Sequence, residues 1–300
     1  MVTAVPPRLR IGIIGSGRVG AVLGAALRRV GHQVTGVTAR TDLSRVRAEA
    51  LLPGVPIRSM LEVAADCDLL LLTVSDDALA GVADEVATVA HPGQYVAHTA
   101  GRFGIRVLEP VTLNSAIPLA LHPSMTFTGT SLDLTRLEDC PFAVTAPPEA
   151  LPVAEALVIE MGGDPIVVSE ESRLIYHAAL AHGANHLVTL VAQTRELLNL
   201  AGVSDPARLV APLLRAALDN ALRDGDAALT GPVARGDAGT LTKHLDDLGE
   251  VAPDIATTYR AMARSTAKRA HEFGALTAEQ RDRLLDVLDG DVLDETERRS

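Results

Sequence analysis

The chain has 300 residues, of which 47% are hydrophobic, so it can bury the cores of two domains. The net charge of −11 and an aromatic content of 2% argue against a nucleic-acid partner, which requires clustered basic residues and stacking rings. We expect neither a membrane span nor a signal peptide, because the sequence has no apolar run of the required length and charge. The two distant cysteines, Cys67 and Cys140, predict free thiols in a reducing cytoplasm.

Residues 1–169 alternate short apolar runs with helical patterns. Buried strands are expected at 9–15, 32–39, 67–74, 93–100, 115–122, 140–146 and 165–168. Helices are expected between them, at 18–31, 76–90 and 148–163. This alternation predicts an α/β domain: a doubly wound, Rossmann-like parallel sheet covered by helices on both faces.

The pattern becomes entirely helical after Ser169, which is expected to cap a helix that runs unbroken to Leu200. Further helices are expected at 205–225, 240–250 and 253–274, with a last short one opening at the capping box Thr277–Gln280. The prediction is therefore two domains, 1–169 for the dinucleotide and 170–300 for substrate. Alanine-rich faces of the helical domain also predict a homodimer, because small residues allow close helix approach.

A glycine-rich turn follows the first expected strand and opens a helix. Its residues are Gly15, Ser16, Gly17, Arg18, Val19 and Gly20. Gly15 permits a tight turn, Gly17 allows a pyrophosphate to approach, and Gly20 allows close packing of helix and strand. With the positive end of the following helix, the turn predicts a dinucleotide site.

The end of the second expected strand indicates which dinucleotide binds. An NAD site usually has an acidic residue here for the ribose, whereas an NADP site has arginine and small polar groups. This stretch contains Thr38, Arg40, Thr41 and Arg45, which favours NADP(H), although surface arginines are also common at the start of a helix. Two more strand ends are expected to contact the cofactor, at Thr73, Val74 and Ser75, and at Thr99, Ala100 and Gly101.

The expected buried helix at Tyr176–Leu190 carries an unusual number of polar residues. At 100° per residue, His182, Asn185 and Thr189 form one narrow stripe, and His177 reaches the same space from one side. Such a stripe predicts a surface that faces a substrate, the alternative being a hydrogen-bonded core network. His182 and His186 have a metal-like spacing, but no HExxH glutamate or third ligand accompanies them, so no metal is expected.

Two loops are expected to contribute to the same site. His122 and Ser124 follow a buried strand, at the edge of the sheet where ligands bind. A second loop carries Thr230 and Arg235, and Arg235 suits a substrate carboxylate. That loop could equally be a connector in which Asp237 caps the next helix.

Five motifs together resemble one bacterial family: GSGRVG, HTAG, LHPSMTF, AALAHGANHLVTL and ALTGPVARGDAGT. The family joins a Rossmann-like NADP-binding domain to a helical domain long catalogued as of unknown function, and it includes ketopantoate (2-dehydropantoate) reductase-like proteins of pantothenate biosynthesis. The layout is more distantly similar to β-hydroxyacid dehydrogenases and pyrroline-5-carboxylate reductases. The resemblance implies that Asn185 matches a catalytic asparagine, whereas His177 stands where ketopantoate reductases have a catalytic lysine.

These observations predict an NADPH-dependent reductase of a small 2-oxo acid, with ketopantoate as the first candidate. We expect His182 or His122 to protonate the forming alkoxide, Asn185 to orient the carbonyl, and Arg235 or Ser124 to hold the carboxylate. One alternative is an imine reductase of the pyrroline-5-carboxylate type, whose substrate arrives already protonated. Another is a non-catalytic NADPH-binding sensor or scaffold.

Overall fold

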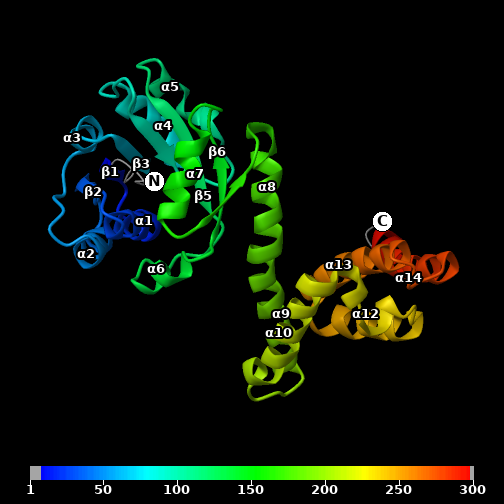
Figure 1. Cartoon of the computed structure of the whole chain (residues 1–300). Helices are drawn as coiled ribbons and strands as arrows, with labels where there is room; N and C mark the ends of the chain where they lie inside the picture. Colours follow the sequence, from blue (N-terminus) through cyan, green and yellow to red (C-terminus); the bar gives the residue numbers. More distant parts are fainter. Residues whose placement is uncertain (1–7, 298–300) are drawn as a thin grey trace, which may run out of the picture. The chain divides into compact units, whose positions relative to one another are not determined.

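Seven strands form a single sheet in the N-terminal part of the chain (Figure 1). The computed structural model describes residues 8–297, with side-chain detail to residue 290. The strand order is β2-β1-β3-β4-β5-β6-β7, and all neighbouring pairs are parallel except β5 and β6. The strands are β1 (Arg10–Ile14), β2 (Gln33–Val37), β3 (Leu69–Leu72), β4 (Tyr95–His98), β5 (Ile117–Pro123), β6 (Pro141–Thr145) and β7 (Asp164–Val167). The predicted mostly parallel, doubly wound sheet is confirmed.

Helices cover both faces of this sheet. One face carries α1 (Arg18–Arg29), α2 (Asp42–Leu51), α6 (Leu132–Arg136) and α7 (Leu151–Glu160). The other carries α3 (Met60–Ala65), α4 (Asp76–Ala87), the 3₁₀ turn η1 (Ile105–Leu108) and α5 (Glu109–Thr112). Side chains alternate between the faces along each strand: Leu69 and Leu71 join the first core, Leu70 and Leu72 the second.

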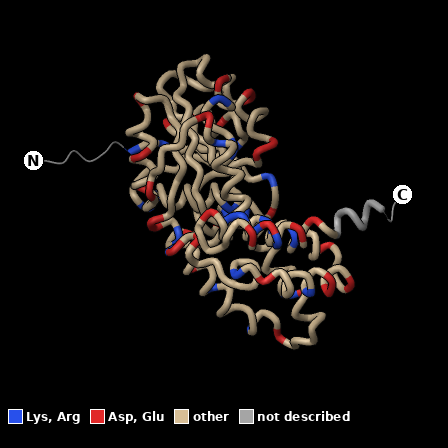
Figure 2. Tube along the Cα trace, turned by 90° about the vertical axis from the view of Figure 1, so that its right-hand side faces the viewer, with Lys and Arg blue, Asp and Glu red and all other residues tan. Residues whose placement is uncertain are grey.

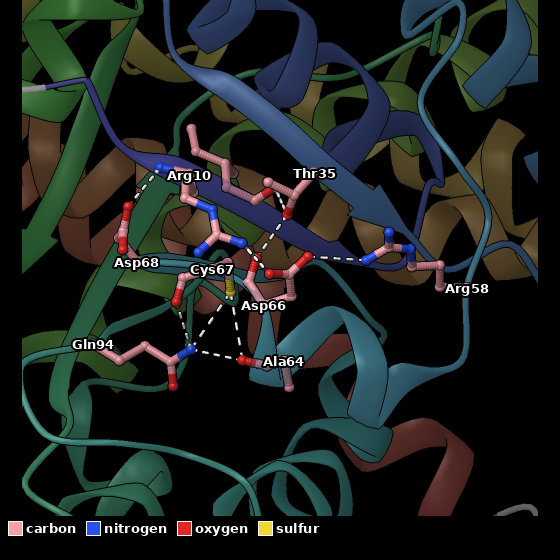
Figure 3. A network of polar contacts seen from close by, with 9 residues as sticks. Arg10, Thr35, Arg58, Ala64, Asp66, Cys67, Asp68 and Gln94 are labelled. Atoms are coloured by element: carbon pink, nitrogen blue, oxygen red, sulfur yellow. Dashed lines mark hydrogen bonds and ion pairs between the residues drawn. The ribbon is translucent and has the colours of Figure 1, made fainter.

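A polar network ties together the amino ends of β1 and β3, opposite the edge that carries the glycine turn (Figure 3). The carboxylate of Asp66 pairs with Arg10 and Arg58, and its backbone carbonyl accepts from Thr35. Buried Gln94 donates to the carbonyls of Ala64 and Cys67. These contacts fix the ends of the strands that lie far from the glycine turn. The network around Asp66 and Gln94 therefore has a structural role.

The long helix after β7 is not uniform. A 3₁₀ turn, η2 (Glu170–Ser172), leads into α8 (Arg173–Leu180), a π-helical segment η3 (Ala181–Asn185) and α9 (His186–Leu200). The prediction of an unbroken α-helix from Ser169 to Leu200 is therefore wrong at η3, whose Gly183 lowers helix propensity locally. Ser169 stands at the N-cap as expected, but its hydroxyl donates to Ser172 rather than capping the backbone.

The chain divides into two compact units, residues 1–185 and 186–300. This division lies further along the chain than the predicted boundary after Ser169, and side chains of both η2 and α8 hydrogen-bond to the sheet unit. The carboxylate of Glu170 accepts from the backbone N–H groups of Ile105 (2.6 Å) and Arg106 (3.4 Å). Arg173 donates to carbonyls of β5 and β6, as described below.

The second unit is helical. After α9 it contains α10 (Pro206–Asp224), η4 (Gly225–Ala228), α11 (Gly231–Ala234), α12 (Ala238–Val251), α13 (Pro253–Glu272) and α14 (Ala278–Glu297). Leu241, Leu245, Ala267 and Leu284 are central to its core. The capping box that opens α14 is confirmed, since Thr277 and Gln280 exchange hydrogen bonds, but the helix is longer than predicted.

Charged residues of both signs are interspersed over the described chain (Figure 2). Among residues 8–297, the longest helices remain too polar or too short to cross a bilayer. Cys67 and Cys140 are free thiols, as predicted, and both are buried.

Candidate active site

The glycine-rich turn lies at the carboxyl ends of β1 and β3, where the strand order reverses. Gly15 has φ +101°, a conformation that favours glycine. Its N–H donates to Thr38 Oγ1 (2.9 Å), and its carbonyl accepts from Thr73 Oγ1 (2.6 Å). The turn is therefore clamped by the ends of two neighbouring strands, which is the position of ligand sites in such sheets.

The other two glycines differ in what surrounds them. A Cβ on Gly20 would lie inside van der Waals contact with the Gly15 carbonyl and Thr73 Oγ1, whereas one on Gly17 would meet no atom within 4 Å. Gly17 is the N-cap of α1, whose first turn contains no acidic residue. Open space, free N–H groups and the positive helix end fit the pyrophosphate of a dinucleotide.

The residues after β2 are less free than the sequence suggests. Thr41 and Ser44 form a capping box at the start of α2, and the Ser44 hydroxyl donates to the Thr41 carbonyl. The buried Ser16 hydroxyl donates to the Thr38 carbonyl (2.8 Å), and the contact of Ser16 with the cofactor remains a prediction. Arg18, Arg40 and Arg45 are exposed. The cofactor contact of Arg18 and the binding of the 2′-phosphate by Arg40 and Arg45 remain predictions.

The residues after β3 and β4 are also predicted to contact the cofactor. The Thr73 hydroxyl is used to hold Gly15, Val74 is half-buried, and Ser75 is the exposed N-cap of α4. Thr99, Ala100 and Gly101 follow β4, and their cofactor contacts likewise remain predictions.

A cluster of hydrogen-bonding side chains stands at the same edge of the sheet, where β5 ends. The hydroxyl oxygen of Tyr176 lies 2.8 Å from His122 Nδ1 and 2.7 Å from Ser124 Oγ. His122 and Ser124 come from the end of β5, and Tyr176 comes from α8. We call these three residues the tyrosine cluster.

Gly101 fits beneath this cluster. A Cβ at position 101 would lie 2.9 Å from His122 Nε2 and 2.6 Å from His177 Cδ2. The rings of His122 and His177 are 6.2 Å apart between centroids and nearly perpendicular. The structure therefore brings together three residues predicted for the site, namely His122, His177 and Gly101.

Arg173 is buried behind the tyrosine cluster with 1% of its surface exposed. It donates to Thr145 Oγ1 (2.7 Å) and to the carbonyls of Ala120 and Ala143 (3.0 Å each), and its Nη1 has no hydrogen-bond partner among the described residues. Its guanidinium carbon is 6.0 Å from the centroid of the Tyr176 ring. A buried cation bonded to neutral oxygens makes its surroundings favourable for negative charge.

The electrostatics of this edge keep His98 and His122 neutral. Burial lowers the pKa of His98 to about 4, despite a hydrogen bond to the Gly104 carbonyl that opposes the shift. Burial, with the charge of Arg173 second, also lowers the pKa of His122 to about 4. Burial raises the pKa of Tyr176, while Ser124 and Arg173 act in the opposite direction. At neutral pH the cluster holds a neutral imidazole and a protonated phenol.

The histidine stripe differs from its prediction in two ways. His182 and Asn185 lie in η3, where π-helical geometry invalidates the 100° projection, and residues 182–190 are exposed rather than buried. π-Helical turns are nonetheless frequent at functional sites. Thr189 belongs to the second unit. The catalytic roles of His182 and Asn185 and the substrate contact of Thr189 remain predictions.

The loop with Thr230 and Arg235 also belongs to the second unit. Asp237 accepts from the Thr240 N–H (3.0 Å) and caps α12, as expected for this residue. Thr230 and Arg235 are exposed, so their predicted contacts with substrate remain open to test. Among the described residues, no group of three or more histidine, cysteine or acidic side chains is arranged to hold a metal.

Sequence reasoning missed two residues of this edge, Arg173 and Tyr176. The available signal was their spacing with His177, since positions i, i+3 and i+4 share one face of a helix. An arginine followed at this spacing by tyrosine and histidine, in an otherwise apolar helix, could have indicated a polar face turned to the sheet.

Comparisons with known proteins agree with this architecture. Residues 2–123 match the Rossmann-like domain family, and residues 140–266 match a family described as a domain of unknown function, DUF2520. No functionally curated protein matches the sequence.

Several solved structures share the fold. A proposed NADP oxidoreductase from Bacteroides fragilis is 22% identical, with a TM-score of 0.73 over 86% of this chain and 98% of that one. A pyrroline carboxylate reductase from Plasmodium falciparum with NADP bound is 12% identical (TM-score 0.57, covering 92% and 98%). An imine reductase from Myxococcus stipitatus in complex with NAD⁺ is 17% identical (TM-score 0.60, covering 93% and 100%).

The chain thus has the two-domain fold of NAD(P)-dependent oxidoreductases. It carries a Rossmann-like domain followed by a DUF2520 domain, which is the domain order of the family that its motifs resemble.

Proposed function

We propose that the protein is an NADPH-dependent reductase of a small 2-oxo acid, with ketopantoate as the first candidate. The observation that carries this proposal is a pair of sites at one edge of the sheet: a glycine turn suited to a dinucleotide, and a tyrosine cluster able to supply a proton. Reduction of a carbonyl requires both a hydride and a proton, so these two sites are complementary.

The chain's own residues suit NADP(H). The N–H groups around Gly17 and the first turn of α1 would bind the pyrophosphate, and Arg40 and Arg45 would bind the 2′-phosphate. When bound, NADPH supplies the hydride. Arg235 would hold the substrate carboxylate, Ser124 being the alternative, and Asn185 would orient the carbonyl. His177 replaces the lysine of ketopantoate reductases, and the two lysines of the chain, Lys243 and Lys268, both lie in the second unit.

An imine substrate of the pyrroline-5-carboxylate type is the second candidate, because a pyrroline carboxylate reductase and an imine reductase share the fold. An iminium ion arrives protonated and needs no proton donor. The tyrosine cluster therefore favours the oxo acid as substrate. Reductase activity that survives substitution of the cluster's side chains would favour the imine.

The first test is oxidation of NADPH with ketopantoate, other 2-oxo acids and pyrroline-5-carboxylate as substrates. We expect turnover with ketopantoate and NADPH to exceed that with NADH. In the Arg40→Ala/Arg45→Ala variant, KM for NADPH should rise about tenfold or more while KM for NADH changes little, since two charge-assisted contacts are lost. Tight binding of NADPH without oxidation by any of these substrates would contradict the proposal and indicate a sensor or scaffold.

We further propose that the protein is a homodimer that associates through helices of the second unit. Several large apolar side chains there are exposed on the single chain, among them Val188 (71%), Leu213 (68%) and Leu222 (79%). Exposed apolar groups of this number usually mark an interface. The Leu213→Glu/Leu222→Glu variant should sediment as a monomer, whereas Leu113→Glu, at an equally exposed leucine of the first unit, should sediment like the wild type. A wild-type monomer at micromolar concentration would refute this assignment.

A further inference from the structure

In the tyrosine cluster, the Tyr176 hydroxyl can release a proton, and His122 and Ser124 hold that hydroxyl in place. We propose that Tyr176, held by His122 and Ser124, is the residue that protonates the substrate oxygen. This assignment rests on the proposed reductase function and replaces His182 or His122 as the proton donor. Ser124 and His122 become positioning residues, because both contact the Tyr176 hydroxyl.

The position of Tyr176 fits this role. Its hydroxyl is anchored at the carboxyl end of β5, and His122 packs against Gly101 at the end of neighbouring β4. The glycine turn and Thr73 lie at the same edge, after β1 and β3. Ligands of open α/β sheets bind along this edge, so a substrate carbonyl beside the dinucleotide would come near the cluster.

Chemistry also favours the phenol over the imidazole. His122 is neutral at pH 7, since its pKa is about 4, and a neutral imidazole is a far weaker acid than a phenol. If His122 Nδ1–H and Ser124 Oγ–H both donate to the Tyr176 oxygen, the phenolic proton is left for the substrate. Because burial raises its pKa, Tyr176 is protonated at neutral pH.

Arg173 explains how the resulting charge is stabilised. Loss of the proton leaves a negative oxygen that already accepts two hydrogen bonds, and the buried guanidinium lies 6.0 Å from the ring. Arg173 itself is hydrogen-bonded to neutral oxygens, so its charge is available to the phenolate at short range. Arg173 is thus a positioning residue that acts on Tyr176 through its charge.

The step balances. As the hydride reaches the carbonyl carbon, the electron pair of the C=O π bond moves to oxygen and takes the Tyr176 proton. The O–H bond of Tyr176 breaks, its electron pair stays on the phenol oxygen, and water returns the proton. The carbonyl is reduced to an alcohol and NADPH is oxidised to NADP⁺.

The Tyr176→Phe variant tests the assignment, with Tyr259→Phe as its matched control. Tyr259 is also hydrogen-bonded to a histidine (His244 Nδ1, 2.9 Å) but lies in the second unit. With the 2-oxo acid that the wild type reduces fastest, kcat of Tyr176→Phe should fall about 100-fold or more, while NADPH affinity and the activity of Tyr259→Phe stay within twofold of wild type.

A spectroscopic titration supplies a readout apart from turnover. The chain has three tyrosines and no tryptophan, so the absorbance of tyrosinate is free of interference, and the step missing in Tyr176→Phe identifies Tyr176. Ser124→Ala should shift that step to higher pH, because one hydrogen bond to the phenolate is lost. An unshifted step would overturn the role of Ser124 in holding the proton donor.

The activities of the wild type and of Tyr176→Phe distinguish a failure of the proton-donor assignment from a failure of the reductase function. If the wild type reduces an oxo acid and Tyr176→Phe is as active, the proton donor is another group and the reductase function stands. If the wild type reduces none of the substrates, the reductase function fails and the donor assignment falls with it.

Discussion

Replacing Gly20 with alanine should lower both the melting temperature and the affinity for NADPH. The new Cβ would overlap the Gly15 carbonyl and Thr73 Oγ1, and Thr73 is itself fixed by its hydrogen bond to Gly15. Overpacking at such a site costs about 3 kcal/mol, which corresponds to a fall in Tm on the order of 10 °C. Because the same shift distorts the turn, NADPH should bind at least about tenfold more weakly. Calorimetry of unfolding and of NADPH binding would measure both effects.

Gly17→Ala is the matched control, since a Cβ there meets nothing within 4 Å. Its φ of −76° suits alanine, so the Tm should change little. NADPH affinity should still fall, because the methyl group would occupy space next to the pyrophosphate. Equal NADPH affinity in Gly17→Ala and wild type would place the dinucleotide elsewhere.

Stability should decrease as the pH falls from 7 to 4, with His98 as a main cause. In the unfolded chain a histidine titrates near its ordinary pKa of 6.5, whereas buried His98 titrates at about 4. Between these values the unfolded state binds more protons than the folded state, so acid favours unfolding. The full shift is worth about 3 kcal/mol, present above pH 6.5 and lost as the pH approaches 4. Urea unfolding at a series of pH values would measure it.

The His98→Gln variant should flatten this dependence by about the same amount, whatever its stability at pH 7. His91→Gln, which changes a histidine of the loop after α4, should keep the wild-type slope. Parallel stability curves for His98→Gln and wild type would show that His98 does not carry the acid sensitivity.

Much of the first unit could be predicted because its signals are local. Apolar runs bounded by glycine or charge mark the strands, and Gly15, Gly17 and Gly20 each have the surroundings that their spacing implies. The turn residues Asp237 and Thr277 likewise cap helices through hydrogen bonds to residues three positions away. Hydrogen bonds between residues only a few positions apart can be predicted from the sequence.

The tyrosine cluster could not be predicted in this way. His122 and Tyr176 are 54 positions apart, and only the docking of α8 on the end of β5 brings them together. The π-helical turn at Ala181–Asn185 has no signature in the apolar pattern, so the 100° projection placed His182 and Asn185 incorrectly. The exposure of residues 182–190 depends on which other elements pack against them, and the apolar pattern of the sequence does not specify those elements.

The hydrogen bond that the Ile105 N–H donates to the Glu170 carboxylate also bears on which substitutions this chain tolerates. A Cβ on Gly104 would overlap the Glu170 carboxylate, so this flexible side chain would have to move and give up its hydrogen bond to Ile105. A single substitution at Gly104 would therefore be disfavoured while Glu170 remains. In relatives with a side chain at position 104 we therefore expect position 170 to have lost this contact, so two positions 66 residues apart are coupled.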